Sequence, residues 1–314
     1  MSTSAQPRFS ANAGRAALLP FVGPQPHPDA SGCWQAPDTE SLDSNPRLRL
    51  LQGFHSAFLP DNRDVFIWLP PSYGLEPERR FPVLYLHDGQ NLIDGRLSYI
   101  AGRTWGAHTT ADRLAKEQRI EPVILVGIAS TGHRRMAEYT PCADTHFGGG
   151  EGALYGRLLV DELKPLIDDA FRTRPEPENT GLAGSSLGGL ISLSLGLDYP
   201  RIFGKLGVLS PSVWWNNRDI LTRVAAKSPV PRPRVWLDMG TAEGLPHLRD
   251  ADLLFHRLRS RGWREGTDLH YLRVPGGLHD ENAWALRFDR VLEWLFPSPA
   301  LGDRLFAEIS TQVQ

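Results

Sequence analysis

This chain of 314 residues carries 34 Lys and Arg residues against 36 Asp and Glu, a formal net charge of −2. Nucleic-acid-binding proteins concentrate an excess of Lys and Arg on one face, so this balance argues against nucleic acid as the main partner. No run of about 18 apolar residues is present, which excludes a transmembrane helix and argues against a membrane partner. The first residues also lack the basic and apolar pattern of a secretory signal.

Residues 1–46 are predicted to form an arm that is disordered or draped over a folded body. They are rich in Pro, Ser, Ala and Gly and show little hydrophobic periodicity. Cys33 lies in this arm, and Cys142 is the second of the two cysteines. Two cysteines are too few for a disulfide framework or a zinc site, so we expect unpaired thiols in a reducing, cytoplasmic environment, with a single disulfide bridge as the alternative.

From residue 47 onward, predicted strands and helices alternate. The predicted strands are residues 48–54, 64–69, 81–86, 122–128, 180–183, 203–209, 234–237 and 269–274. The predicted helices are residues 111–118, 155–171, 187–197, 219–226, 248–261 and 283–295. This alternation predicts an α/β fold with a mostly parallel central sheet and helices on both faces. No internal repeat is visible, so residues 47–314 are expected to form one catalytic domain.

A serine motif follows the predicted strand at residues 180–183. The residues Gly184-Ser-Ser-Leu-Gly188 fit G-x-S-x-G and lead directly into a predicted helix. Strand before and helix after is the context of a nucleophile elbow, a sharp turn that exposes one serine hydroxyl. Position in the motif makes Ser186 the predicted nucleophile, and the helix N-terminus places N–H groups where an oxyanion would form. A Gly/Ser turn that only connects the two elements is the alternative.

A serine nucleophile needs a histidine base, which in this kind of fold follows it in the chain. Four histidines do so. His256 falls within a predicted helix and His270 within a predicted strand, whereas His279 lies in a Gly-rich loop between the last strand and the last helix. His279 is therefore the predicted base, and His247, interpreted as a loop residue, is the reserve candidate.

The base in turn needs a carboxylate to orient it. Glu243 follows the strand at residues 234–237 in a loop that can reach the loop of His279. Asp238 competes for this role, but it lies near the end of the strand itself, where a buried carboxylate would need a structural partner. We predict Glu243 as the acid and interpret Asp280 as a loop-capping residue.

The predicted oxyanion hole has two backbone donors. One is the N–H of Leu187, the residue after the nucleophile. The second is expected from the loop after the strand at residues 81–86, which reads His87-Asp-Gly-Gln-Asn91. Gln90 is the predicted donor and Gly89 the next candidate, while a simple tight turn is the alternative.

Together these motifs resemble the putative-esterase family of α/β-hydrolases, which includes enterochelin (siderophore) esterases, feruloyl esterases and S-formylglutathione hydrolases. The residues that carry the resemblance are Leu69-Pro-Pro-Ser-Tyr, Pro82-Val-Leu-Tyr-Leu-His-Asp-Gly-Gln-Asn, Glu138-Tyr-Thr-Pro, Ala183-Gly-Ser-Ser-Leu-Gly-Gly, Ser210-Pro-Ser-Val-Trp-Trp and Gly276-Gly-Leu-His. The resemblance implies an α/β-hydrolase fold and the same three catalytic positions, Ser186, Glu243 and His279. Cytoplasmic enterochelin esterases carry an extra N-terminal domain, which residues 1–46 are too few to form, and this weakens the case for the catecholate siderophore itself.

Tryptophans near the predicted carboxyl edge of the sheet are candidates to hold an aromatic acyl group, a sugar or a lactone ring. Trp214 and Trp215 are the stronger candidates, and Trp105 and Trp284 the weaker; packing in the core is the alternative for each. Arg135 and its neighbour Arg134 are candidates for binding a carboxylate or phosphate of the substrate, and a solvated pair in a loop is the alternative.

No metal or nucleotide motif is present. The chain has no H-E-x-x-H and no aspartate-rich loop, and the glycine-rich residues 148–152 fit neither a dinucleotide motif nor a P-loop. We interpret residues 148–152 as a loop over the site and expect no cofactor. The sequence therefore predicts a serine carboxylic-ester hydrolase for a small or aromatic ester, with an acyltransferase or a non-catalytic binding module as alternatives.

Overall fold

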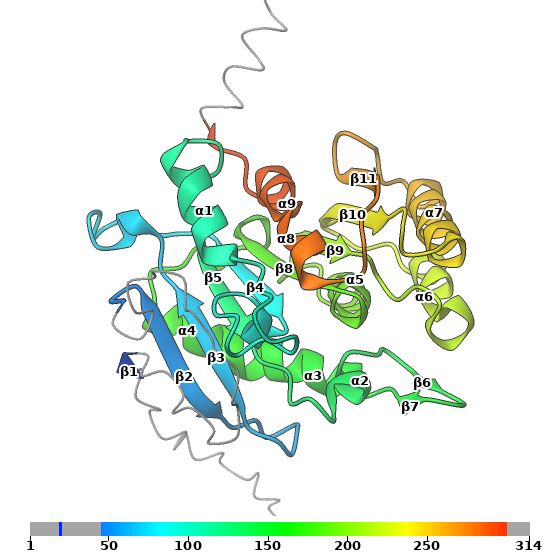
Figure 1. Ribbon diagram of the computed structural model, residues 1–314, viewed down its shortest axis with the longest axis horizontal. Coiled ribbons are helices and arrows are strands. Elements are labelled where there is room, and N and C mark those ends of the chain that lie inside the picture. The colour runs from blue at the N-terminus through cyan, green and yellow to red at the C-terminus, as the bar shows by residue number, and fades with distance from the viewer. Residues whose placement is uncertain (1–18, 21–44, 300–314) are drawn as a thin grey trace, which may run out of the picture.

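The computed structural model describes residues 19–20 and 45–299 (Figure 1). A nine-stranded sheet has the order β1-β2-β3-β5-β4-β8-β9-β10-β11. Its strands are β1 (Leu19–Pro20), β2 (Leu48–Phe54), β3 (Arg63–Trp68), β4 (Val83–His87), β5 (Ile124–Ile128), β8 (Thr180–Ser185), β9 (Lys205–Leu209), β10 (Arg234–Gly240) and β11 (Leu269–Val274). A separate hairpin consists of β6 (Ala143–Asp144) and β7 (Gly148–Gly149).

Six neighbouring strands, from β5 through β4, β8, β9 and β10 to β11, run parallel to one another. Strand β3 is antiparallel to both of its neighbours, β2 and β5. The predicted mostly parallel sheet is therefore confirmed. The predicted arm falls outside the described residues except for residues 19–20, which pair with β2, and residues 45–46.

Helices cover both faces of the sheet, as predicted (Figure 1). The helices are α1 (Ala107–Lys116), α2 (Arg135–Glu138), α3 (Gly152–Arg157), α4 (Lys164–Ala170), α5 (Leu187–Asp198), α6 (Trp215–Ala226), α7 (Leu245–Ser260), α8 (Glu281–Ala285) and α9 (Phe288–Leu295). Side chains of β4 alternate between the faces: Val83 and Tyr85 pack in the core under α3 to α7, and Leu84 and Leu86 in the core under α1, α8 and α9. Within the described ranges, no helix has the length and apolar character needed to cross a membrane.

Two of the predicted helices are interrupted in the structure, whereas the bounds of the others shift by a few residues. The helix predicted at residues 155–171 contains a π-helical segment, Leu158–Leu163, between α3 and α4. The helix predicted at residues 283–295 is interrupted between α8 and α9, at Leu286 and Arg287. The interruption coincides with Arg287, whose side chain enters the core and pairs with Asp238. At this position a charged side chain with a buried partner interrupts the apolar periodicity that a single straight helix would show.

The sheet order places the chemistry-bearing loops together. Strands β4, β8, β9, β10 and β11 are parallel neighbours, so their carboxyl ends lie at one edge of the sheet. The loops that follow them carry the residues predicted to form the oxyanion hole, the nucleophile, the acid and the base. These residues are far apart in the sequence but adjacent at this edge.

Candidate active site

Ser186 occupies a strained turn between β8 and α5. Its φ of 59° and ψ of −122° are rarely adopted by residues other than glycine, and such strain is found where a side chain must be aimed precisely. The turn closes tightly, because a Cβ added at Gly184 would lie 3.0 Å from the Gly188 carbonyl carbon, and one at Gly189 would lie 2.9 Å from the Leu209 oxygen. The predicted sharp turn from strand to helix is present.

His279 and Glu243 form a hydrogen-bonded chain with Ser186. The Nε2 atom of His279 lies 3.0 Å from Ser186 Oγ, and its Nδ1 atom lies 2.6 Å from Glu243 Oε2. His279 projects from the loop between β11 and α8, and Glu243 from the loop between β10 and α7. The structure thus brings together the three side chains that the sequence singled out from three separate loops.

The Glu243 carboxylate is held on both oxygens. Its Oε1 atom accepts hydrogen bonds from the Gly240 N–H at 2.8 Å and from the Ser210 hydroxyl at 2.6 Å, while Oε2 faces His279. Burial alone would raise the pKa of Glu243, but the hydrogen bonds from His279, Ser210 and Gly240 outweigh it and lower the pKa. Glu243 is therefore ionised at neutral pH and presents one oxygen to the imidazole.

Asp238, the competing acid, lies inside β10 and bonds to other groups. Its carboxylate accepts hydrogen bonds from the Trp236 indole N–H at 2.7 Å and the Ser210 backbone N–H at 3.1 Å, and it pairs with Arg287 at 2.9 Å. Burial raises the pKa of Asp238, and Arg287 counteracts this effect. The expectation that a carboxylate here would need structural partners is confirmed.

The other histidines after Ser186 lie in regular elements. His256 is in α7, and His270 is in β11, where it stacks on Trp236 with ring centroids 4.5 Å apart. His247 lies in the first turn of α7, so its interpretation as a loop residue is wrong. Within the described residues, His279 is the histidine hydrogen-bonded to Ser186. Asp280 caps α8 by accepting a hydrogen bond from the Ala283 N–H at 2.9 Å, as expected.

A short 3₁₀ turn, Gly89–Asn91, follows β4 beside the serine turn. A Cβ added at Gly188 would lie 3.3 Å from the Cβ of His87 and 3.6 Å from Asp88 Oδ2, so this loop touches the start of α5. In the described part of the chain, the backbone N–H groups of Gly89, Gln90 and Leu187 have no protein acceptor. Three backbone donors are thus free, one on the residue after Ser186 and two in the turn whose preceding residues touch the start of α5. The Gln90 side chain is hydrogen-bonded to Ser130 through both its amide nitrogen and its amide oxygen, so the backbone N–H is the group of Gln90 that is left without a partner.

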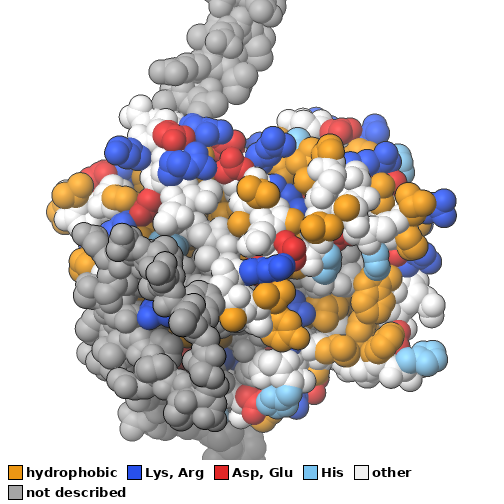
Figure 2. Space-filling view, viewed as in Figure 1, with side chains coloured by type: hydrophobic (Ala, Val, Ile, Leu, Met, Phe, Trp, Pro, Cys, Tyr) orange, Lys and Arg blue, Asp and Glu red, His pale blue; other side chains and the backbone are white. Residues whose placement is uncertain are grey.

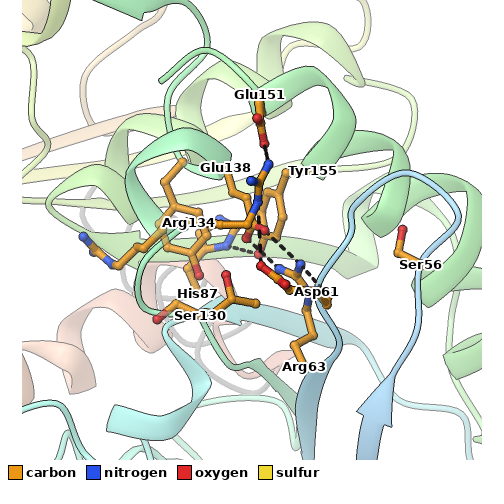
Figure 3. Close-up of polar contacts among 12 residues, drawn as sticks. Ser56, Asp61, Arg63, His87, Ser130, Arg134, Glu138, Glu151 and Tyr155 are labelled. Atoms are coloured by element: carbon orange, nitrogen blue, oxygen red, sulfur yellow. Dashed lines mark hydrogen bonds and ion pairs between the residues drawn. The ribbon is translucent and has the colours of Figure 1, made fainter. Parts of the chain in front are cut away.

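Buried polar side chains lie behind this turn (Figure 3). Arg63 of β3 and Glu138 of α2 form a fully buried bidentate pair at 2.7 and 3.0 Å. The Tyr139 hydroxyl accepts the Asp88 N–H at 3.1 Å, and the Tyr155 hydroxyl meets His87 Nδ1 at 2.9 Å. These contacts give structural roles to the Glu138-Tyr-Thr-Pro motif, for which the sequence had suggested none.

His87 is neutral in this environment. Burial lowers its pKa to about 3, against the smaller opposing effect of Asp88, while Arg135 adds to the lowering. It therefore acts as a fixed hydrogen-bonding group beneath the turn, and it does not titrate near neutral pH.

Gly89→Ala is expected to disturb the turn and lower activity. The new Cβ would lie 2.5 Å from the carbonyl carbon of Gly127 in β5, so backbone must move. We expect a loss of about 1–3 kcal/mol in unfolding free energy, together with at least a roughly tenfold fall in kcat as the N–H groups shift. Urea unfolding and ester hydrolysis measure the two effects. The matched control is Gly74→Ala, because nothing lies within 4 Å of a Cβ there and φ is −80°; equal behaviour of both variants would contradict the prediction.

A pocket of about 310 Å³ opens above Ser186. Its lining residues are Ser186, Ser210, Pro211, Ser212, Trp214, Met239, Glu243, His247 and His279. Hydrophobic and histidine side chains gather on the face of the molecule seen in Figure 2, over the region of α6 and the loop after β11. The pocket therefore combines apolar walls with the polar groups needed for proton transfer.

Of the candidate substrate-binding tryptophans, Trp214 lines this pocket and is 39% exposed. Phe147, between β6 and β7, packs on it with ring centroids 5.9 Å apart. Of residues 148–152, which were expected to form a loop, 148–149 form β7, 150–151 are irregular and Gly152 begins α3. Phe147 brings the β6–β7 hairpin beside the pocket. Phe147 was not recognised from the sequence, because an isolated aromatic residue in a polar segment has no pattern.

Three of the four tryptophan predictions are wrong, because Trp215, Trp105 and Trp284 are buried. Trp215 is 1% exposed and donates its indole N–H to the Cys142 carbonyl oxygen at 2.8 Å. Trp105 is 4% exposed and packs against Trp284 and Phe288. Both are core residues because their large apolar rings are withdrawn from water by the helices above them.

Trp284 lies under the base and is also buried. Its ring meets His279 edge-on, with centroids 5.0 Å apart, and its indole N–H donates to Ser210 Oγ at 3.1 Å. Trp284 therefore supports the site from below.

Arg135 is engaged with Asp88. Its Nε and Nη2 atoms lie 2.7 and 2.8 Å from the two carboxylate oxygens, beside the turn that holds Gly89. It is partly exposed, so it stays a candidate for substrate contact, with its charge shared with Asp88. Arg134 pairs with Glu151. Cys142 carries a free thiol, and Cys33 lies outside the described residues.

Comparisons with known proteins agree on one family. The sequence pattern of the family described as "Putative esterase" matches residues 56–295. The "Uncharacterized protein YbbA" of Bacillus subtilis is 28% identical over 259 residues, covering 78% of this chain and 97% of that protein. The "Iron(III) enterobactin esterase" of Dickeya dadantii is 40% identical over 191 residues, 60% of this chain and 39% of that protein. The solved BES protein from Bacillus cereus has the same fold, with a TM-score of 0.66, 19% identity and coverage of 85% of this chain and 99% of that one.

Proposed function

Because this chain belongs to the "Putative esterase" family and is a carboxylic-ester hydrolase, we propose that it is a serine esterase whose nucleophile is Ser186. His279 is the proposed general base, and Glu243 orients it. The observation that carries the proposal is the continuous chain from Ser186 Oγ through both nitrogens of His279 to Glu243, with contacts of 3.0 and 2.6 Å.

The proposed reaction proceeds through an acyl-enzyme. Ser186 Oγ attacks the ester carbonyl carbon while His279 Nε2 takes the hydroxyl proton, and Glu243 stabilises the imidazolium that forms. The carbonyl oxygen becomes an oxyanion facing the N–H of Leu187 and that of Gln90 or Gly89. When the bond to the alcohol oxygen breaks, His279 gives the proton to that oxygen. Water then attacks the acyl-enzyme by the same steps and releases the acid.

The proposed substrate is a small ester with an aromatic or lactone component. Trp214 and Phe147 supply an aromatic wall beside Ser186, which favours a planar group. One relative is named as an iron(III) enterobactin esterase, which is consistent with this class. The partly exposed His279 leaves the base accessible to water, as hydrolysis of an acyl-enzyme requires. The intact hydrogen-bonded chain argues against a non-catalytic binding module.

A hydrolysis panel tests this proposal. Methyl ferulate, methyl acetate, an acetylated sugar and a trilactone siderophore are compared by titrating the released acid. We expect a higher kcat/KM for methyl ferulate than for methyl acetate, and Trp214→Ala to lower the ferulate value about tenfold with little change for acetate. If none of these esters is hydrolysed, the proposal is overturned. An equal loss on both methyl esters would place Trp214 outside acyl recognition.

Two controls sharpen the panel. Leu75→Ala removes an exposed apolar side chain that follows β3, whose antiparallel direction puts it at the opposite edge of the sheet; it should leave all rates unchanged. Added ethanol tests the acyltransferase alternative. With a methyl ester as the acyl donor, a transferase would form the ethyl ester faster than the free acid.

A further inference from the structure

Ser210 joins three side chains beneath the proposed triad. Its hydroxyl donates to Glu243 Oε1 at 2.6 Å and accepts from Arg287 Nη2 at 2.6 Å and from the Trp284 indole at 3.1 Å. One donated and two accepted hydrogen bonds satisfy the hydroxyl completely. Ser210 also has a positive φ of 40°, so its backbone is held in an uncommon conformation where these groups meet.

Arg287 links two buried carboxylates. Its Nη2 atom lies 2.9 Å from Asp238 Oδ1 and 3.7 Å from Glu243 Oε1. The side chains of Arg287, Asp238 and Glu243 are 3%, 0% and 2% exposed. Two carboxylates and one guanidinium are therefore almost fully buried together, with one negative charge in excess when His279 is neutral. Uncompensated charge is costly in such surroundings.

We propose that Asp238 and Arg287 are positioning residues that set the charge against which His279 accepts the proton of Ser186. This inference rests on the proposed function of the same site. Protonation of His279 brings the cluster of Glu243, Asp238, Arg287 and His279 to zero net charge, so the buried excess favours the imidazolium of the transition state. Asp238 does not line the pocket and acts through Arg287 and Ser210.

Other charged and titratable groups lie in the same pocket or on the neighbouring elements. His247 of α7 lines the same pocket, and Asp280 is paired with Arg103 at 3.0 Å. Glu281 of α8 accepts a hydrogen bond from Asn91 at 3.3 Å, and Asp88 is paired with Arg135. Because His247 places a second imidazole in the same pocket, each profile is repeated in a His247→Gln background.

The test compares Asp238→Asn with the double variant Asp238→Asn/Arg287→Gln. The single change removes the excess negative charge, which disfavours the imidazolium form of His279. The acidic limb of the kcat/KM profile then moves down by about half a pH unit or more, so activity persists to lower pH. The double variant restores one negative charge in excess, and its limb returns to within about 0.2 units of wild type.

If Asp238 and Arg287 had only a structural role, the double variant would differ more from wild type than the single variant, because it is the more altered protein. An unmoved limb in Asp238→Asn, or a double variant further from wild type than the single one, overturns the inference. If Asp238→Asn does not fold, Arg287→Gln is used instead. It leaves a second uncompensated carboxylate, which should move the acidic limb of the kcat/KM profile to higher pH. A limb that does not move up overturns the inference. Folding is checked by circular dichroism.

The matched control is Asp168→Asn. Asp168 of α4 also pairs with a cation, Lys164, at 2.6 Å, and it accepts a hydrogen bond from Thr173. Thr173 pairs with the residue before Pro82 and β4, so Asp168 lies at the amino ends of the strands, opposite the proposed site. Its limb should match that of wild type. Failure of the proposed function gives a distinct result, since the wild-type protein would then hydrolyse no ester and Ser186 would not react with a fluorophosphonate.

Discussion

Ser186→Ala is expected to lower kcat/KM for ester hydrolysis by about 10⁴-fold or more, because no acyl-enzyme can form without the Oγ atom. The hydroxyl removed is the one that lies 3.0 Å from His279 Nε2. Ser186 is strained at φ 59°, and alanine has the same Cβ, so the turn should persist and the protein should stay folded. The residual rate would come from the free N–H donors of the turn and of Leu187.

Hydrolysis of a p-nitrophenyl ester and labelling by a fluorophosphonate measure this effect. Mass spectrometry should locate the phosphonyl group on Ser186 in the wild-type protein, and the alanine variant should stay unlabelled. Ser185→Ala is the matched control, because Ser185 lies in the same motif but at the end of β8, where it is buried. Equal rates in Ser186→Ala and wild type would contradict the proposed nucleophile.

Glu243→Gln is expected to lower kcat by about 10³–10⁴-fold, since it forces the wrong tautomer on the base. Oε1 of Glu243 accepts from the Gly240 N–H and the Ser210 hydroxyl, so the amide oxygen of glutamine must take that place. The NH₂ group then faces His279 Nδ1, which has to accept a hydrogen bond. The ring proton moves to Nε2, the atom that must receive the proton of Ser186.

The competing carboxylate provides the control for this prediction. Asp238→Asn makes the same chemical change in a neighbouring buried acid that has no contact with His279 in the described structure. At pH values above the acidic limb of the profile, this variant should keep its activity within about tenfold of wild type. Steady-state kinetics at pH 8 compare the two. A large loss in Asp238→Asn with little loss in Glu243→Gln would reverse the assignment of the acid.

Local patterns in the sequence were sufficient for the elements and for the three proposed catalytic side chains. Apolar runs and helical periodicity predicted the alternating strands and helices, because each depends on residues only a few positions apart. G-x-S-x-G between a strand and a helix pointed to Ser186, and chain order together with loop composition pointed to His279 and Glu243. These signals depend on nearby residues or on the order of residues along the chain, and not on which strands are neighbours in the sheet.

Tertiary structure alone decided what surrounds those side chains. Ser210 meets Arg287, 77 residues away, and Asp238, 28 residues away, and Arg63 meets Glu138 across 75 residues. Trp105 and Trp215 are buried while Trp214 is exposed, although all three have the same side chain. Such pairings and burials depend on strand order and on which face each helix covers. A buried charge or ring is stabilised by partners that the fold supplies from distant segments, and no local pattern records them.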